Sequence, residues 1–435
     1  MIYRWTIVCA LLGLVVACDA ADSPEVSPTP TQEEVDPTRS AELRLRAREA
    51  GLIPLLENPV TSSPALVEIG EALFFDPVLG GELDVACSTC HHPTMGFADG
   101  VDFPIGVAGE GLGPDRHYPP GAQYRELGEL RELGRSSPTL MNLAILLEDA
   151  RSRGIDPPLT WDGRTAEFGG FSRMPMRVRD EMRGDEFPQL STMDVLLERL
   201  DGLDWYRSRF TEVFPEVLEQ GIELHHFTMA LSAYQLSLVS PPTEYDLFLA
   251  GGPAPDTEFL DGMELFLELG CANCHNGLST SDLSFHRTGV PVGRLSRPFQ
   301  AGIDIGRQEL TGRASDRFRF RTAPLREVAH TAPYMHNGSL ATLEDVVLFY
   351  TSGENPLAEH APEVTMDQLE RGTPRALQEG EVAALVRFLH GMSSSEGVIE
   401  QLFPEPESVP SGLDVSAVPL DERQENSQPD ENVSP

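Results

Sequence analysis

The chain has 435 residues, enough for two or three domains with hydrophobic cores, and 40% of its residues are hydrophobic, as is usual for a soluble globular protein. It carries 69 acidic and 32 basic residues, a formal net charge of -37. This charge argues against nucleic acid as a partner, because phosphate binding needs a basic surface. The 36 prolines and 38 glycines indicate long loops between short helices.

The first 18 residues are predicted to be a lipoprotein signal peptide. Arg4 precedes an apolar run at 7–16 that is short for a membrane span, and Val15-Val16-Ala17-Cys18 resembles a lipobox. The pattern implies a mature chain that starts at a lipidated Cys18 and is held at a membrane by several acyl chains. An ordinary signal peptide, cleaved nearby, is the alternative, and both export the chain.

Residues 19–50 are predicted to form a flexible tether, rich in Pro, Ser, Thr and acidic residues, that ends in a short charged helix. Beyond it, apolar residues at helical spacing predict a series of further helices. These lie at about 64–75, 140–147, 191–214, 223–239, 257–269, 343–350 and 379–391. Between them, the polar stretch 108–134 is expected to be a surface loop.

Two motifs carry the chemistry: Cys87-Ser-Thr-Cys-His91 and Cys271-Ala-Asn-Cys-His275. C-x-x-C-H is the attachment signature of c-type haem. The cysteines add to the haem vinyl groups, and the adjacent histidine is placed to bind iron from the proximal side. Metal-binding or redox CxxC turns are the alternative, but the histidine after both pairs argues against them.

The cysteine count supports this interpretation. The chain has six cysteines, and the two haem motifs use four of them, Cys87, Cys90, Cys271 and Cys274. The other two, Cys9 and Cys18, lie in the leader, so no cysteine is left for a disulfide. Such a chain is held together by its cofactors rather than by bridges.

Each haem motif follows an amphipathic helix, so the expected fold is mainly α, with two cytochrome-c-like haem domains, long loops and little β. The predicted domains are an N-terminal haem domain at 51–245 and a C-terminal haem domain at 246–395. The acidic, Pro-rich residues 396–435 are expected to form a largely disordered tail.

Several further motifs occur in a fixed order between residues 50 and 393. They are Leu73-Phe74-Phe75-Asp76-Pro77, Ser137-Pro138-Thr139-Leu140, Trp161-Asp162-Gly163-Arg164, Thr322-Ala323-Pro324-Leu325-Arg326 and Thr331-Ala332-Pro333-Tyr334-Met335-His336. Together with the haem motifs they resemble the bacterial di-haem cytochrome c peroxidase and MauG family. The resemblance implies an N-terminal haem that reacts with hydrogen peroxide and a C-terminal haem that relays electrons.

The resemblance also implies roles for single residues. His91 and His275 match the proximal iron ligands, and Trp161 matches a tryptophan that carries electrons or holes between the haems. Glu181 matches the catalytic glutamate, which takes a proton from one peroxide oxygen and delivers it to the other. A core tryptophan and a surface glutamate are the plain alternatives.

Three positions depart from the family's peroxidases. Phe171 stands where a glutamine usually precedes the glutamate. Val107 stands where a distal histidine closes the first haem, so that haem is expected to be open, with His117 as the alternative ligand. Tyr350 stands where a methionine binds the second iron, as in MauG-like proteins, with Met335 as its competitor. A phenolate favours ferric and higher states and lowers the potential.

The family also has a calcium ion between its domains. Thr331 and Pro333 match the residues that provide carbonyl oxygens, whereas Ser136 replaces an asparagine. A hydroxyl oxygen is a poorer ligand than an amide oxygen but a usable one. The resemblance therefore implies a calcium ion in addition to two haem c groups.

These patterns predict a lipid-anchored enzyme of the MauG-like branch on the periplasmic side of the cell envelope. Hydrogen peroxide would be the oxidant. The reductant would be a small cytochrome c or cupredoxin, or a partner protein whose aromatic side chain is oxidised. The acidic charge favours a basic electron-donor protein, although solubility alone also explains it. The rival hypothesis is a non-enzymatic di-haem electron-transfer cytochrome.

Overall fold

The computed structural model describes residues 36–120, 133–185, 188–189, 191–290, 304–355, 357, 364–365, 368–371 and 375–415. The leader, Cys18 and residues 19–35 of the tether lie outside these residues. Within them, no helix is both long and apolar enough to span a bilayer.

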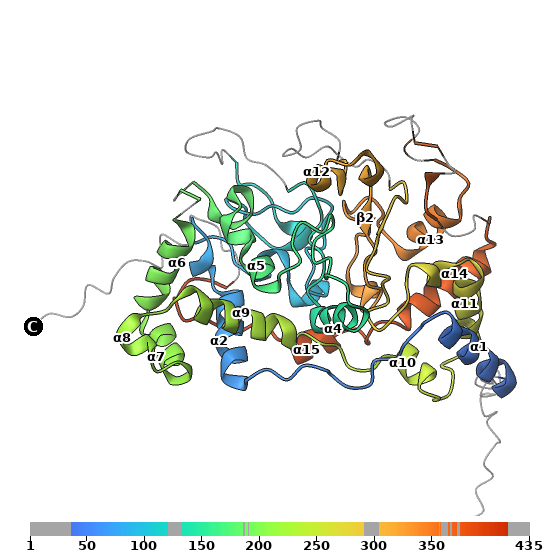
Figure 1. Ribbon diagram of the computed structural model, residues 1–435, viewed down its shortest axis with the longest axis horizontal. Coiled ribbons are helices and arrows are strands. Elements are labelled where there is room, and N and C mark those ends of the chain that lie inside the picture. The colour runs from blue at the N-terminus through green and yellow to red at the C-terminus, as the bar shows by residue number, and fades with distance from the viewer. Residues whose placement is uncertain are drawn as a thin grey trace, which may run out of the picture. The chain divides into compact units, whose positions relative to one another are not determined.

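The predicted fold class is confirmed, because the described residues are mostly helical and form one short pair of strands (Figure 1). The helices of the first half are α1 (Pro37–Glu49), α2 (Pro64–Phe75), α3 (Cys87–Cys90), α4 (Leu143–Arg153), α5 (Phe168–Arg173), α6 (Thr192–Asp201), α7 (Asp204–Val213), α8 (Val217–Gln220) and α9 (Leu224–Ser237). The second half contains α10 (Glu244–Leu249), α11 (Thr257–Glu268), β1 (Phe285–His286), α12 (Gln308–Thr311), β2 (Phe320–Arg321), α13 (Leu343–Thr351), α14 (Glu379–His390) and α15 (Val398–Leu402).

A close helix pair organises each half. In the first half α2 packs on α9, and Gly70 lets the backbones approach, since a Cβ there would overlap the carbonyl group of Ala230. In the second half α11 packs on α14, and Gly262 lies in the same way against the carbonyl group of Ala384. A haem motif follows α2 and α11 in turn, so the two halves repeat one arrangement.

Each pair lies in its own hydrophobic cluster. The first cluster contains Phe74 and Phe227, and the second contains Phe259 and Phe388, each of them with no exposed surface. Helix α11 shows why the sequence forms these elements. Its N-cap Asp256 accepts a hydrogen bond from the backbone N–H of Phe259 (2.7 Å), and its apolar residues recur at helical spacing. The predicted domain boundaries at 51–245 and 246–395 remain a prediction.

The N-terminal end of the first half packs on the second half. Helix α1 contacts α10 and α11 (Figure 1). Arg39 and Arg46 of α1 bond the carboxylate of Glu264 at 2.9 and 3.0 Å. The backbone N–H of Leu55 then donates to the buried carboxylate of Asp246 (2.7 Å).

The end of the chain returns to the first half. The expected disorder of 396–435 is wrong for residues 396–415, where α15 and the following loop join the first hydrophobic cluster through Ile399 and Val409. Ser411 bonds the buried carboxylate of Asp76, and the ring of Phe403 packs edge-on against Phe97. A few apolar residues in an acidic, Pro-rich segment were enough to order it. Residues 416–435 lie outside the described part.

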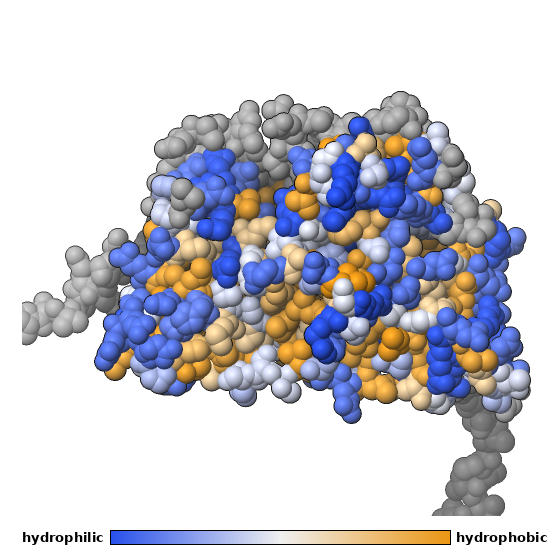
Figure 2. Space-filling model, viewed as in Figure 1, coloured by the Kyte–Doolittle hydropathy of each residue, from blue (hydrophilic) through white to orange (hydrophobic). Residues whose placement is uncertain are grey.

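The visible face mixes hydrophilic and hydrophobic residues. Figure 2 shows hydrophilic residues at both ends of this face and hydrophobic residues in separate patches between them.

Candidate functional site

The first haem motif is shaped for a covalent cofactor. Helix α3 is a single turn that carries Cys87 and Cys90, and His91 follows at its C-cap. The His91 Nδ1 lies 3.0 Å from the carbonyl oxygen of Phe97. A carbonyl oxygen only accepts, so Nδ1 carries the proton and Nε2 is left with a free lone pair. Burial lowers the pKa of His91 to about 4, which keeps the ring neutral and able to bind iron.

The second motif repeats this chemistry. Cys271 begins a short 3₁₀ turn, Cys274 follows, and His275 donates from Nδ1 to the carbonyl oxygen of Thr280 (3.3 Å). Burial lowers the pKa of His275 to about 4 as well. Both cysteine pairs and both histidines therefore fit c-type haems, with each Nε2 available to an iron.

A large cavity lies beside the second motif. One wall is made by Cys271, Cys274 and His275, and other lining residues include Trp161, Met335 and Tyr350. The structure thus brings together two distant parts of the chain that the sequence analysis assigned to the second haem. Both proposed distal ligands, Tyr350 and Met335, reach this cavity.

Tyr350 lies on α13, where burial and a neighbouring positive charge act on its phenol in opposite directions. Burial raises the pKa of Tyr350 to about 12, whereas its hydrogen bond with Thr288 and the charge of Arg371 act in the opposite direction. The Arg371 guanidinium is held by the carbonyl oxygens of Thr288 (2.6 Å) and Phe349 (3.1 Å), and its Nη2 is buried without a partner. This positive charge offsets part of the effect of burial, but the pKa of the phenol stays raised, so the bond to an iron would itself have to displace the phenol proton.

Trp161 joins the two halves. Its indole Nε1 donates to the carbonyl oxygen of Ser136 (2.8 Å), in the first half. Its own carbonyl oxygen accepts from the backbone N–H of Arg321 (2.9 Å), in the second half, and its ring meets His336 edge-on with centroids 6.5 Å apart. A half-buried indole in this position can exchange electrons with groups on either side.

Glu181 lies on a π-helical turn, Arg179–Arg183, a geometry that is frequent at functional sites. It is half-buried, and burial raises its pKa to about 7, with the charge of Arg164 opposing and that of Asp180 reinforcing this shift. Its charge also acts on Cys90 of the first motif. A carboxyl group near this haem with a pKa close to neutrality can both accept and release a proton.

The turn that carries Glu181 packs on the segment of the missing distal histidine. Gly106 lies so close to the carbonyl oxygens of Asp180 and Glu181 that a Cβ there would overlap both. The next residue, Val107, is fully buried in the first core. By contrast, His117 is exposed, and its Nδ1 donates to the carbonyl oxygen of Asp115 (2.9 Å). The structure thus places Gly106, in a segment with a valine where the family has a histidine, against the turn that carries the glutamate.

The other residues predicted from the sequence lie in the first core or in the wall of the large cavity. Phe171 is buried in the first core on α5. Ser136, Thr331 and Pro333 all line the large cavity. The Ser136 hydroxyl is 3.2 Å from a carboxylate oxygen of the buried Asp99, whose pKa burial raises to about 6.

Sequence reasoning missed three residues of these sites, Asp99, Arg321 and Arg371. None belongs to a motif that carries a role by itself. Asp99 follows the first haem motif closely, which was the only local signal. Arg321 and Arg371 are two of many arginines, and only folding shows that they line the cavity.

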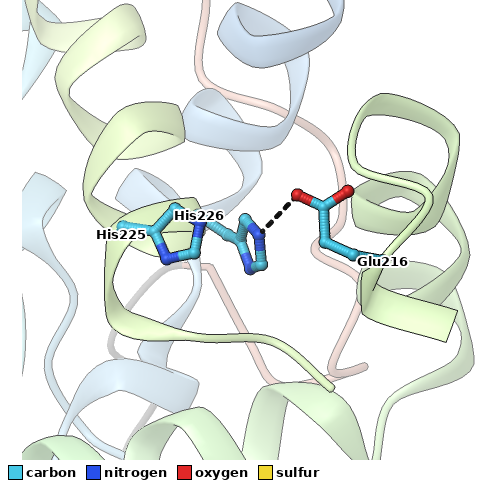
Figure 3. A group of neighbouring side chains, drawn as sticks. All are labelled: Glu216, His225 and His226. Atoms are coloured by element: carbon cyan, nitrogen blue, oxygen red, sulfur yellow. Dashed lines mark ion pairs between the residues drawn. The ribbon is translucent and has the colours of Figure 1, made fainter. Parts of the chain in front are cut away.

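Two clusters of the described residues have the composition of a metal site, and one of them, Cys274 with Asp282 and His286, belongs to the second haem motif. The other lies away from both motifs. Ligand atoms of Glu216, His225 and His226 lie within 4.8 Å of one another (Figure 3). However, the Nδ1 of the fully buried His226 accepts the backbone N–H of Glu223 (3.1 Å), so the proton of the neutral ring is on Nε2, which faces the Glu216 carboxylate at 3.5 Å. A protonated nitrogen has no lone pair for a metal, so this is a carboxylate–imidazole pair.

Comparisons with known proteins agree with the two haem motifs. The family model CCP_MauG, described as di-haem cytochrome c peroxidase, matches residues 64–254. The methylamine utilization protein MauG of Methylorubrum extorquens is 30% identical over 364 residues, which cover 82% of this chain and 86% of that protein. The chain belongs to the di-haem cytochrome c peroxidase and MauG family. The cytochrome c551 peroxidase of Pseudomonas aeruginosa is 28% identical over 337 residues, covering 77% of this chain and 80% of that protein.

Solved structures show the same fold. A MauG-like protein associated with microbial copper homeostasis has a TM-score of 0.58 at 24% identity, covering 81% of this chain and 95% of the other. The di-haem peroxidase BthA of Burkholderia thailandensis has a TM-score of 0.57 at 21% identity, covering 78% of this chain and 88% of the other. The family member described here is thus a peroxide-using di-haem oxidoreductase with two c-type haems, and the carrier hypothesis is not favoured.

Proposed function

We propose that this enzyme is a MauG-like di-haem peroxidase whose first haem is always open to peroxide. The observation that carries the proposal is the packing of the Glu181 turn on Gly106, next to Val107. A valine side chain cannot bind iron, so no ligand at this position has to leave before peroxide enters. The haems, when bound, supply the iron that reduces peroxide and stores its oxidising equivalents.

The protein groups then have distinct tasks. His91 and His275 hold the two irons through Nε2. Glu181 accepts a proton from the peroxide oxygen nearer the iron and returns it to the leaving oxygen, which departs as water. Trp161 links the two halves electronically, and Tyr350 would hold the second iron as a phenolate, a role supported by the cavity that it shares with His275.

The resting state tests the proposal directly. Electron paramagnetic resonance of the ferric protein is expected to show one high-spin signal from the first haem and one low-spin signal from the second. The high-spin signal is expected because the valine at position 107 cannot bind the iron that His91 would hold. Two low-spin signals would contradict an open first haem and revive a carrier function.

Trp161 provides a second test. Trp161→Phe removes the indole but keeps an aromatic ring, so peroxide should still react at the first haem while oxidation of the second haem is slowed at least tenfold, an order-of-magnitude expectation for losing an electronic link. Stopped-flow spectra of both haems after one equivalent of peroxide measure this. Trp205→Phe, a change on α7 away from the cavity, is the matched control. Equal rates in all three proteins would remove the role of Trp161.

The proposed reductant is a protein, either an electron carrier or a MauG-like target that is itself oxidised. A small cytochrome or cupredoxin would return two electrons per peroxide, whereas a MauG-like target would lose them from an aromatic side chain. The phenolate proposed for Tyr350 favours the second mode, because it stabilises the oxidised second haem. The net charge of -37 favours a basic surface on the partner.

A calcium ion is part of the proposal. The Ser136 hydroxyl and the carbonyl oxygens of Thr331 and Pro333 are the proposed ligands, and they line one cavity. Asp99, hydrogen-bonded to Ser136, adds a carboxylate that a hard cation would favour. The Ser136 carbonyl oxygen accepts a hydrogen bond from Trp161, so the hydroxyl oxygen is the atom of Ser136 that would bind calcium.

The proposed location is the periplasmic side of the cell envelope. The lipobox-like Val15-Val16-Ala17-Cys18 supports a lipid anchor at Cys18, and the polar residues 19–35 would tether the enzyme to it. The two haem motifs support export as well, since c-type haem is attached outside the bacterial cytoplasm.

A further inference from the structure

Arg321 is a buried cation without an acidic partner. It lies on β2 and is 5% exposed. Within the described part of the chain it makes no ion pair, and its only side-chain hydrogen bond runs from Nη1 to the carbonyl oxygen of Pro158 (3.2 Å). Its Nε is buried and has no acceptor. Burial lowers the pKa of Arg321 to about 10, yet the group stays charged at neutral pH.

Two other arginines, the largely covered Arg135 and the buried Arg326, have the acidic partners that Arg321 lacks. Arg135 binds Asp304 through two nitrogens and also contacts Asp162. Arg326 binds Asp246 inside the second core. A buried charge without a counter-charge strongly destabilises the folded state. An anion bound beside Arg321 would remove this cost, and none of the described residues provides one.

The position of Arg321 indicates where that anion comes from. Arg321 lines the large cavity together with Cys274 and His275, which are the attachment groups of the second haem. Its guanidinium carbon lies 5.4 Å from the ring centroid of Trp161, within reach of a cation–π contact. Every c-type haem carries two propionate carboxylates, and these are the anions that a haem would bring into the cavity.

We propose that Arg321 binds a propionate of the second haem. Because the guanidinium also contacts the Trp161 ring, it holds that propionate next to Trp161, the residue that connects the two halves. The inference rests on the two c-type haems and not on the open first haem. Arg321 acts on the reaction through the haem and Trp161, so it is a positioning residue. Its positive charge favours the reduced second haem.

The test is the reduction potential of each haem in Arg321→Gln. Glutamine keeps a polar side chain but removes the charge, so the potential of the second haem should fall while that of the first is unchanged. The propionate-bending band of the second haem in resonance Raman spectra should shift as well. Arg321→Lys should restore most of the potential but not the band, because lysine keeps the charge without the planar fork. Arg151→Gln, which removes the same charge from the surface, should change neither quantity.

An unchanged potential and an unchanged band in Arg321→Gln would overturn the proposal. Haem content and circular dichroism establish that the variant is folded and loaded. If Arg321→Gln does not accumulate, Arg321→Lys decides alone. A propionate-bending band identical to that of the parent protein would show that the guanidinium group makes no bond to the propionate, because lysine cannot reproduce its planar fork. Resting-state electron paramagnetic resonance of the same samples reports the open first haem separately, so failure of one proposal is distinguishable from failure of the other.

Discussion

Glu181→Gln is expected to slow the reaction with peroxide by about 10²–10⁴-fold, the usual contribution of a positioned acid–base group. Glutamine fills the same space but neither accepts nor returns the proton that must move between the peroxide oxygens. Haem content and the resting spectra should be unchanged, because Glu181 is not a ligand. Stopped-flow absorbance with increasing peroxide gives the second-order rate constant that checks this.

The same role of Glu181 predicts how the rate constant of the peroxide reaction changes with pH. The pKa of Glu181 is raised to about 7, so the accepting carboxylate is lost as the pH falls through this value. The rate constant of the parent protein should therefore decline below about pH 7, and Glu181→Gln should lack this decline. Asp180 raises the pKa of Glu181, so Asp180→Asn should keep the activity and move the decline to lower pH. A full rate with Glu181→Gln at every pH would exclude the proton-transfer role.

Tyr350→Met is expected to raise the reduction potential of the second haem by a few tenths of a volt, since axial ligands set haem potentials over about 0.8 V. A thioether favours the ferrous state, whereas a phenolate favours ferric and higher states. The oxidised second haem should then be less stable after peroxide is added. Potentiometric titration followed in the absorption bands of both haems measures the shift.

Tyr350→Phe and Met335→Leu are the matched variants for this ligand. Tyr350→Phe removes the phenol oxygen and should convert the second haem to a different coordination state, visible in its low-spin signal. Met335→Leu should leave that signal unchanged, although Met335 lines the same cavity. The opposite pattern would assign the ligand to Met335.

The helices could be predicted because their signals are local. Apolar spacing predicted a helix at 343–350, which is α13, and its N-cap Thr342 accepts a hydrogen bond from the Asp345 N–H (3.1 Å). Apolar spacing predicted α11 within a residue at its C-terminal end. The mainly helical class with little β followed from these patterns and from the two haem motifs.

Long-range features could not be predicted in this way. The return of residues 396–415 depends on contacts such as Ser411 with Asp76, which no local pattern contains. The approach of the Glu181 turn to Gly106 depends on packing between segments some 75 positions apart (181 minus 106). The solitary charge of Arg321 becomes visible only when its neighbours are known, because burial and the lack of an acid are properties of the folded chain.

The return of the C-terminal segment bears on the order of events during biogenesis. Residues 398–415 lie far from the first haem motif in the sequence, yet they pack beside it, where Glu405 lies 3.4 Å from His92 and Phe403 meets Phe97. Until they arrive, the neighbourhood of Cys87 and Cys90 lacks part of its cover. Closure of the first haem pocket therefore depends on the docking of this distant segment, and before that docking the thiols of a newly exported chain are more accessible to the attachment machinery.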